Sequence, residues 1–240
     1  MELNRPLLKQ QAKGLLQAAK PSPMAAAALF IALSALFSFL SSRLVGVSYE
    51  TLDRVSRLIS QGNTEYAVDV LLASSPSPGA YGINLLLELT LTIVRTGLLL
   101  FVLNTVRGTG AALGNLLDGF AQFWRILLLQ IVSGIFIALW SLLFIVPGII
   151  AAYRYSLAFF ILLDHPEYGV MDCLRESKRL TQGRKMELFK LDLSFLGWML
   201  LASLPYVGFL VSLWVTPYYL LTLALYYERF NGSVEPEKYL

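Results

Sequence analysis

Three ionisable side chains occur inside long apolar segments of the sequence, where an ionised group is costly to bury. Glu88 and Arg95 lie in the segment 82–106, and Arg154 lies in the segment 148–163. Ionisable residues are rare inside membrane helices, where they usually form ion pairs or line a polar pathway. We therefore treat Glu88, Arg95 and Arg154 as a candidate intramembrane polar cluster.

The spacing of these residues indicates how they could meet. Glu88 lies six residues inside one end of its segment and Arg154 lies six residues after Gly148, so both are expected about 9 Å below the same membrane boundary. Arg95 follows Glu88 by seven residues, so it shares the same helical face but lies deeper. Two interpretations stay open. One is an internal clasp of ion pairs, favoured because one carboxylate and two arginines are a small set for transport. The other is the wall of a polar cavity for an anion or a proton path.

The remaining polar residues argue against an enzyme. The chain has one cysteine, Cys173, and one histidine, His165, which removes most zinc sites, thiolate clusters and His-based catalytic arrangements. We expect no aspartate within the membrane, and the sequence contains neither the G-x-x-x-x-G-K-S/T phosphate-binding pattern nor the H-E-x-x-H zinc pattern. The sequence thus predicts no catalytic, cofactor-binding or metal-binding residues. The formal net charge of +3 also gives no reason to expect a nucleic-acid partner.

The elements that must position these side chains are long apolar helices. Hydrophobic residues make up 56% of the 240 residues, charged residues only 15%, and the mean hydropathy is +0.62, whereas an average soluble domain is roughly 25% charged. The sequence predicts an all-α, polytopic transmembrane helical bundle of about six membrane helices with amphipathic surface helices. The predicted spans are 24–42, 82–106, 126–146, 148–163, 191–204 and 208–227. They form a transmembrane domain at 24–230, between a cytoplasmic amphipathic segment at 1–23 and a cytoplasmic tail at 231–240.

Two Pro/Gly sites divide apolar runs that are too long for one crossing. One is Pro147-Gly148 and the other lies within 204–208. Proline lacks the backbone N–H and glycine adopts the backbone angles of a tight reversal. A single helix over 126–163 would be about 57 Å long, nearly twice the hydrocarbon thickness. Both sites are therefore predicted to be hairpin turns.

Charge placement predicts the orientation. Of the 19 Lys and Arg residues, 14 lie on the side that holds both termini in the six-helix arrangement, and three lie in the opposite loop at 43–81. Cytoplasmic loops carry the excess of Lys and Arg in membrane proteins. The sequence therefore predicts a multi-pass protein with both termini in the cytoplasm.

Amphipathic segments lie outside the predicted spans. Residues 4–20 place leucine and alanine on one helical face, so this helix is expected either to lie on the inner leaflet or to pack against the bundle. Residues 49–59 are predicted to form a second amphipathic helix on the opposite side of the membrane, which is expected either to cap the bundle or to rest on the outer surface.

A basic helix at about 170–181 is the candidate contact for anionic lipid. Clusters of Lys and Arg beside membrane helices attract anionic headgroups by about 1 kcal/mol per residue. The alternative is ordinary anchoring by positive charge on the cytoplasmic side, and this alternative is the favoured one. The residues in question are Arg175, Lys178, Arg179, Arg184 and Lys185.

Several blocks of the sequence resemble the DUF975 family of bacterial membrane proteins of unknown function. These blocks are LWSLLFIVPGIIAAYRYSLAFFILLDHPEY, ESKRLTQGRKMELFKLDLSFLGW and LWVTPYY, with QQAKGLL and GNLLDGFAQFWR before them. The resemblance implies a bacterial integral membrane protein and carries over no catalytic residues. The family pattern often has a small polar residue where Arg154 stands and does not call for Glu88, so the resemblance implies that their pairing is particular to this chain.

The leading interpretation is a non-enzymatic protein of the bacterial plasma membrane that acts through lipid or protein contacts. Its expected partners are membrane lipids, including anionic ones, and either a second copy or another membrane protein. The alternative is a small-solute or ion transporter with a polar cavity near Glu88, Arg95 and Arg154.

Overall fold

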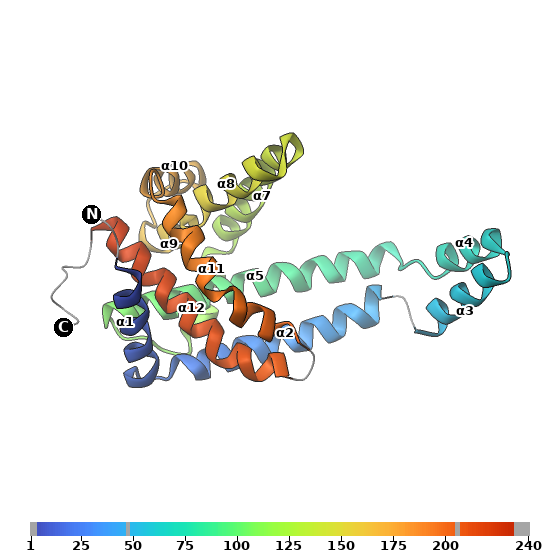
Figure 1. Cartoon of the computed structure of the whole chain (residues 1–240), viewed down its shortest axis with the longest axis horizontal. Coiled ribbons are helices and arrows are strands. Elements are labelled where there is room, and N and C mark those ends of the chain that lie inside the picture. The colour runs from blue at the N-terminus through green and yellow to red at the C-terminus, as the bar shows by residue number, and fades with distance from the viewer. Residues whose placement is uncertain (1–3, 47–48, 205–206, 233–240) are drawn as a thin grey trace. The chain divides into compact units, whose positions relative to one another are not determined.

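The computed structural model describes residues 4–46, 49–204 and 207–232, and every element in these ranges is a helix (Figure 1). The predicted all-α class is thus confirmed. The chain forms two compact units: Met1–Ile31 with Thr92–Leu240, and Ala32–Leu91. Each unit is described by itself below.

The first unit contains most of the helices, including parts of α2 and α5. Its buried core is formed mainly by apolar side chains of α5, α9 and α12. The helices that lie wholly or partly in this unit are α1 (Arg5–Ala18), α2 (Pro23–Val45), α5 (Pro78–Arg107), α6 (Asn115–Asp118), the 3-10 helix η1 (Gly119–Gln122), α7 (Phe123–Leu143), α8 (Ile145–Tyr155), α9 (Ala158–Asp164), α10 (Val170–Leu180), α11 (Lys185–Ala202) and α12 (Val207–Asn231).

Five helical stretches in the described part of the chain are long and apolar enough to cross a membrane. They are Pro23–Val45, Pro78–Arg107, Asn115–Leu143, Ile145–Asp164 and Val207–Asn231. Such helices are typical of membrane proteins. The predicted segment 191–204 differs from them, because α11, which contains most of it, starts at Lys185 and carries four ionisable side chains.

The reversal predicted at Pro147-Gly148 occurs earlier in the chain. Phe144 follows the end of α7 in an extended conformation, with φ −162° and ψ 155°, and α8 packs back against α7. Pro147 instead lies in the first turn of α8, where its missing N–H is tolerated. Gly148 allows the two helices to approach closely, because a Cβ there would collide with the Ser141 side chain. The second predicted reversal includes residues 205–206, which lie outside the described residues.

The N-terminal helix α1 packs against α12, so the interpretation in which it packs on the bundle is the one observed. Asn4 Oδ1 accepts a hydrogen bond from Leu7 N at 3.3 Å, as an N-cap does. Lys9 Nζ donates to Ser194 Oγ at 2.9 Å and lies 4.2 Å from the centroid of the Phe195 ring. The apolar face predicted from the sequence is buried through Leu8, Ala12 and Leu16.

Helix α10 matches the predicted basic helix closely. The Asp172 carboxylate accepts a hydrogen bond from Gly169 N at 3.2 Å at its start, and Gly183 follows its end with a φ of 76°. Cys173 and Ser177 are fully buried on its inner face. The polar face therefore points away from the bundle.

The second unit contains the end of α2, the start of α5 and a helical hairpin between them. The hairpin consists of α3 (Tyr49–Ser60) and α4 (Thr64–Ala73), which pack against each other through the buried Val55 and Ala67. Ser41 Oγ donates to Asn84 Oδ1 at 2.5 Å and joins α2 to α5. The sequence predicted α3 within one residue but gave no helix at α4.

Candidate functional site

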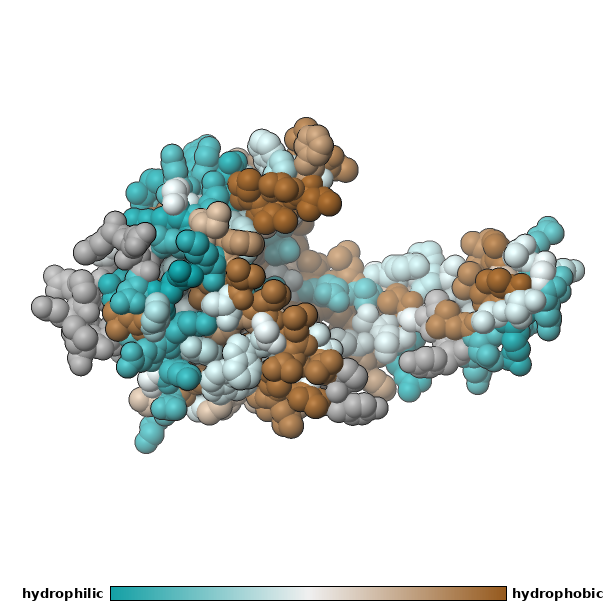
Figure 2. All heavy atoms as spheres, viewed as in Figure 1, coloured by the Kyte–Doolittle hydropathy of each residue, from teal (hydrophilic) through white to brown (hydrophobic). Residues whose placement is uncertain are grey.

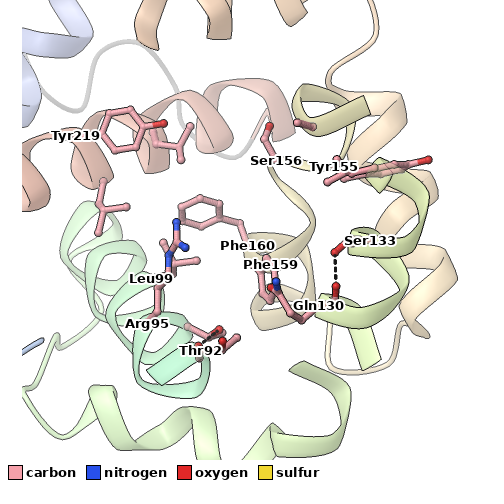
Figure 3. A pocket seen from close by; sticks show the side chains of 16 residues that line it. Thr92, Arg95, Leu99, Gln130, Ser133, Tyr155, Ser156, Phe159, Phe160 and Tyr219 are labelled. Carbon is pink, nitrogen blue, oxygen red and sulfur yellow. Dashed lines mark hydrogen bonds between the residues drawn. The ribbon is translucent and has the colours of Figure 1, made fainter. Parts of the chain in front are cut away.

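The first unit contains a cavity of about 350 Å³ between α5, α7, α8, α9 and α12 (Figure 3). Its lining combines apolar side chains with hydroxyl, amide and guanidinium groups. Among the described residues that line it there is no carboxylate, and Arg95 carries the only formal charge. Its main polar lining residues are Thr92, Arg95, Gln130, Ser133, Tyr155 and Tyr219.

Arg95 faces the cavity because α5 places it one turn from Thr92 and Leu99, which line the same wall. Figure 3 shows its side chain extending from α5 toward Phe160 and Tyr219. The guanidinium presents five N–H donors and no acceptor. The cavity is therefore suited to a group that accepts hydrogen bonds and carries negative charge.

The neutral polar groups of the wall are held in place by their own helices. Ser133 Oγ donates to the Gln130 carbonyl oxygen at 3.2 Å (Figure 3), and Thr96 Oγ1 donates to the Thr92 carbonyl oxygen at 2.9 Å. Such bonds to a carbonyl one turn back satisfy hydroxyl donors inside apolar helices. These two bonds use the hydroxyl donors of Ser133 and Thr96 within their own helices, and the oxygens keep lone pairs.

Tyr219 connects the cavity to an aspartate that the sequence analysis missed. Its hydroxyl donates to Asp192 Oδ1 at 2.9 Å, and the Tyr153 hydroxyl donates to Asp192 Oδ2 at 2.7 Å. This three-residue cluster ties together α8, α11 and α12. The expectation of no aspartate within the membrane overlooked Asp192, although it lies in the predicted segment 191–204.

Arg154 lies in a different place from Arg95. It lines a separate hollow with Trp140 and Pro147, and its Cζ is 5.8 Å from the centroid of the Trp140 ring. Its Nε is buried and has no hydrogen-bond partner among the described residues. The structure therefore does not bring Arg95 and Arg154 together in one cavity.

Glu88, the third member of the predicted cluster, belongs to the other unit and is exposed on α5. Its proposed pairing with Arg154 stays a prediction. The prediction that Glu88 pairs with Arg154 rested on their equal expected depth in the membrane. It did not consider the ring of Trp140, which lies on one side of the Arg154 guanidinium. An arginine over an aromatic face is stabilised without a carboxylate.

A buried ion cluster joins α5, α9 and α12, and the sequence analysis did not find it. Arg107 donates from Nη1 to Asp164 Oδ1 at 2.6 Å and from Nη2 to Asp164 Oδ2 at 2.9 Å. Its Nε donates to Glu228 Oε1 at 2.8 Å, and Glu228 is only 1% exposed. The Tyr227 hydroxyl adds a hydrogen bond to Asp164 Oδ2 at 2.7 Å. The cluster holds three helices at one end, which is a structural role.

The basic residues proposed to contact anionic lipid are partly paired within α10. Arg175 forms an ion pair with Asp172 at 2.9 Å, and Arg179 forms one with Glu176. The Arg179 side chain donates hydrogen bonds that lower the pKa of the Glu176 carboxyl. The Asp172 and Glu176 carboxylates reduce the net positive charge of this face, while the side chains of Arg175 and Arg179 stay 75% and 68% exposed.

The other basic residues of this set lie beside α10. The Arg184 guanidinium carbon lies 4.8 Å from the centroid of the Phe230 ring, and Lys178 is exposed. Lys185 begins α11. Contact of these residues with anionic lipid stays a prediction. No group of three or more His, Cys, Asp or Glu residues in the described ranges is arranged to hold a metal ion.

Comparison with known proteins agrees with the resemblance of the sequence blocks. No curated protein and no solved structure is significantly similar to the chain. Residues 144–233 match the model of the family described as "Protein of unknown function (DUF975)", from the extended residue after α7 to just beyond α12. Over residues 144–233 this chain is therefore similar to the DUF975 family.

Proposed function

We propose that this chain is a multi-pass integral membrane protein of the bacterial plasma membrane that binds an anionic amphiphile in the Arg95 cavity. The ligand class is a carboxylate or phosphate headgroup with an apolar tail. The protein has no enzymatic activity in this proposal, and both termini are cytoplasmic. The observation that carries the proposal is a cavity whose described lining contains one guanidinium and no carboxylate.

The chemistry of the wall supports this ligand class. The Arg95 side chain is exposed at the cavity, so its guanidinium is accessible to an anion. A carboxylate or phosphate can accept two parallel N–H bonds from arginine. The apolar side chains Leu99, Ile137 and Phe159 line the rest of the space, which suits a hydrocarbon tail. The volume falls within the range of about 300–1,000 Å³ that is usual for ligand pockets.

Binding of a ligand from within the membrane also agrees with the leading interpretation of the sequence, in which the protein acts through lipid contacts. A transporter of small anions is the second candidate, because the same cavity would hold the substrate. In that case Arg95 would be the binding residue and Arg154, which lies in another hollow, would not. Anion uptake into proteoliposomes, absent in an Arg95→Gln variant, would favour this second candidate.

The proposal is tested by ligand-induced stabilisation of the full-length chain in lipid nanodiscs. The anionic probe is decanoate, and the control is decyltrimethylammonium, which has the same tail and the opposite charge. Any molecule that binds only the folded state raises its stability. We expect decanoate, and not the cation, to raise the unfolding temperature of the wild-type protein.

Matched variants identify the residue responsible. Arg95→Gln should abolish the stabilisation by decanoate, whereas Arg154→Gln should retain it, because both remove an arginine from an apolar helix but only one faces the cavity. Equal stabilisation of the wild type and Arg95→Gln would contradict the proposal. Equal stabilisation by the two probes would contradict it as well, because the tail alone would then explain binding.

A further inference from the structure

Asp192 of α11 is a carboxylate that is held by two tyrosine hydroxyls and by no cation. Tyr153 of α8 donates to its Oδ2 at 2.7 Å, and Tyr219 of α12 donates to its Oδ1 at 2.9 Å. Among the described residues, no lysine or arginine forms an ion pair with Asp192. A carboxylate with neutral donors alone lacks the adjacent positive charge that favours the ionised form. Within membrane proteins, such carboxylates often serve as proton-binding groups.

Asp192 stands where the surface of α11 changes from polar to apolar. The four ionisable side chains of α11 lie in its first eight residues, and Asp192 is the last of them. Beyond it, the exposed side chains of this helix are mainly apolar, among them Leu193, Leu196 and Leu200. Figure 2 shows hydrophobic side chains gathered over the later part of α11 and the beginning of α12. Asp192 is itself partly exposed, so a proton from water can reach it.

Tyr219 joins this carboxylate to the Arg95 cavity. The Tyr219 side chain lines the cavity, whereas Asp192 and Tyr153 do not. Figure 3 shows the Arg95 side chain extending toward Tyr219. A tyrosine hydroxyl has one hydrogen to donate. With Asp192 ionised, the hydrogen of Tyr219 is directed to Asp192 Oδ1, and none is left for a ligand in the cavity.

We propose that Tyr219 links anion binding in the Arg95 cavity to the uptake of one proton by Asp192. A protonated carboxyl group is a donor as well as an acceptor. Once Asp192 takes a proton from water, its own hydroxyl donates to the Tyr219 oxygen, and Tyr219 turns its hydrogen to the anion beside the Arg95 guanidinium. The same proton removes a negative charge behind Tyr219. The inference rests on the proposed anion binding and adds its regulation by protons.

Other charged groups near this cluster define the controls. The electrostatic surroundings of Tyr219 include Asp192 and Arg95, and those of Tyr153 include Asp192. Lys9 of α1 contacts the next turn of α11 through Ser194. Within two helical turns of these contacts α12 carries no charged side chain, and the charged residues of α8 and α11 are Arg154, Lys185, Glu187 and Lys190. Glu187 is the one carboxylate in that set, so Glu187→Gln is the control for the site of protonation.

The test measures the affinity of the full-length chain in phosphatidylcholine nanodiscs for decanesulfonate, an anion whose charge does not change with pH. Asp192→Asn imitates the protonated carboxyl group, because an amide both donates and accepts. At about pH 8, where carboxyl groups are ordinarily ionised, we expect Asp192→Asn to bind the probe about tenfold more tightly than the wild type. The wild-type affinity should rise toward that of Asp192→Asn as the pH falls, while the affinity of Asp192→Asn stays constant. Glu187→Gln should behave like the wild type.

Two tyrosine variants separate the shared hydroxyl from a general effect of charge. Tyr219→Phe should bind the probe through Arg95 as the wild type does at the higher pH, which also shows that this variant is folded. The gain in affinity from Asp192→Asn should be lost on the Tyr219→Phe background and kept on the Tyr153→Phe background, as double-mutant cycles measure. A full gain on the Tyr219→Phe background would overturn Tyr219 as the link.

The remaining outcomes separate this inference from the proposed function. Equal affinity of the wild type and Asp192→Asn, with binding that still requires Arg95, would overturn the proton link and leave anion binding intact. A Glu187→Gln variant that binds as tightly as Asp192→Asn would overturn Asp192 as the proton site. Absence of Arg95-dependent binding in both the wild type and Asp192→Asn would overturn the proposed function together with the inference.

Discussion

Replacing Arg107 with methionine should destabilise the first unit strongly, because it leaves two carboxylates without their cation. The guanidinium contacts both oxygens of Asp164 and one oxygen of Glu228. The two carboxylate side chains are 15% and 1% exposed, so water can replace few of the lost bonds. Removing one partner of a buried ion pair costs about 3–5 kcal/mol. We expect a loss in this range for Arg107→Met.

The charge count of the cluster predicts an order for the other variants. Glu228→Gln keeps an oxygen that accepts from Arg107 and leaves one cation with one carboxylate, so it should cost about 1 kcal/mol. Asp164→Asn removes the bidentate partner and weakens the bond from Tyr227, so about 2–3 kcal/mol is expected. The predicted order of destabilisation is Arg107→Met, then Asp164→Asn, then Glu228→Gln.

The assay is equilibrium unfolding of the purified protein in mixed micelles, followed by circular dichroism as the denaturing detergent fraction is raised. The double variant Arg107→Met/Glu228→Met should lose less stability than the sum of its two single variants, because it strands one fewer charge. A loss below about 0.5 kcal/mol for Arg107→Met would refute the ion-cluster account. So would a Glu228→Gln variant that is as unstable as Arg107→Met.

Three further outcomes follow from the same structure. Glu176→Gln should cost at most about 0.5 kcal/mol, because its partner Arg179 is exposed to water. This contribution should be present above the usual carboxyl pKa of 4.5 and vanish as pH falls through the lowered pKa, as a pH titration of unfolding would show. Gly97→Ala should destabilise by more than Gly134→Ala in the same assay, because its Cβ would lie 2.6 Å from the Asn115 carbonyl oxygen while the Gly134 position has open space. Burial raises the pKa of the Cys173 thiol, so a maleimide should label the wild-type protein only after unfolding; prompt labelling of the folded protein would contradict its burial.

Local features of the helices could be predicted well from the sequence. Asn4 and Pro6 mark the start of α1, and Gly169 and Gly183 flank α10, because capping depends on a few neighbouring residues. The sequence correctly predicted a chain reversal near Pro147 but placed it three residues too late, because the turn is at Phe144. Proline fits the first turn of a helix as well as a turn before it, and sequence alone does not separate the two cases.

Pairings between distant segments could not be predicted. Arg107, Asp164 and Glu228 each stand near the end of an apolar segment, where an isolated charge is common and signals no partner. Their contacts depend on how three helices align in space. For the same reason, the expected membrane depth of Arg154 did not predict its contact with the Trp140 ring, although both residues lie in the hairpin of α7 and α8. Of the predicted cluster, only Arg95 lines the cavity to which a function is assigned here.

The most direct test of the proposed function is a structure of the full-length chain crystallised from a lipid mesophase. We predict density for a non-protein molecule in the cavity, with its headgroup at hydrogen-bonding distance from the Arg95 guanidinium and its tail along Leu99 and Ile137. A cavity closed by side chains, or Arg95 paired with the Glu88 carboxylate, would contradict anion binding and would support a purely structural clasp.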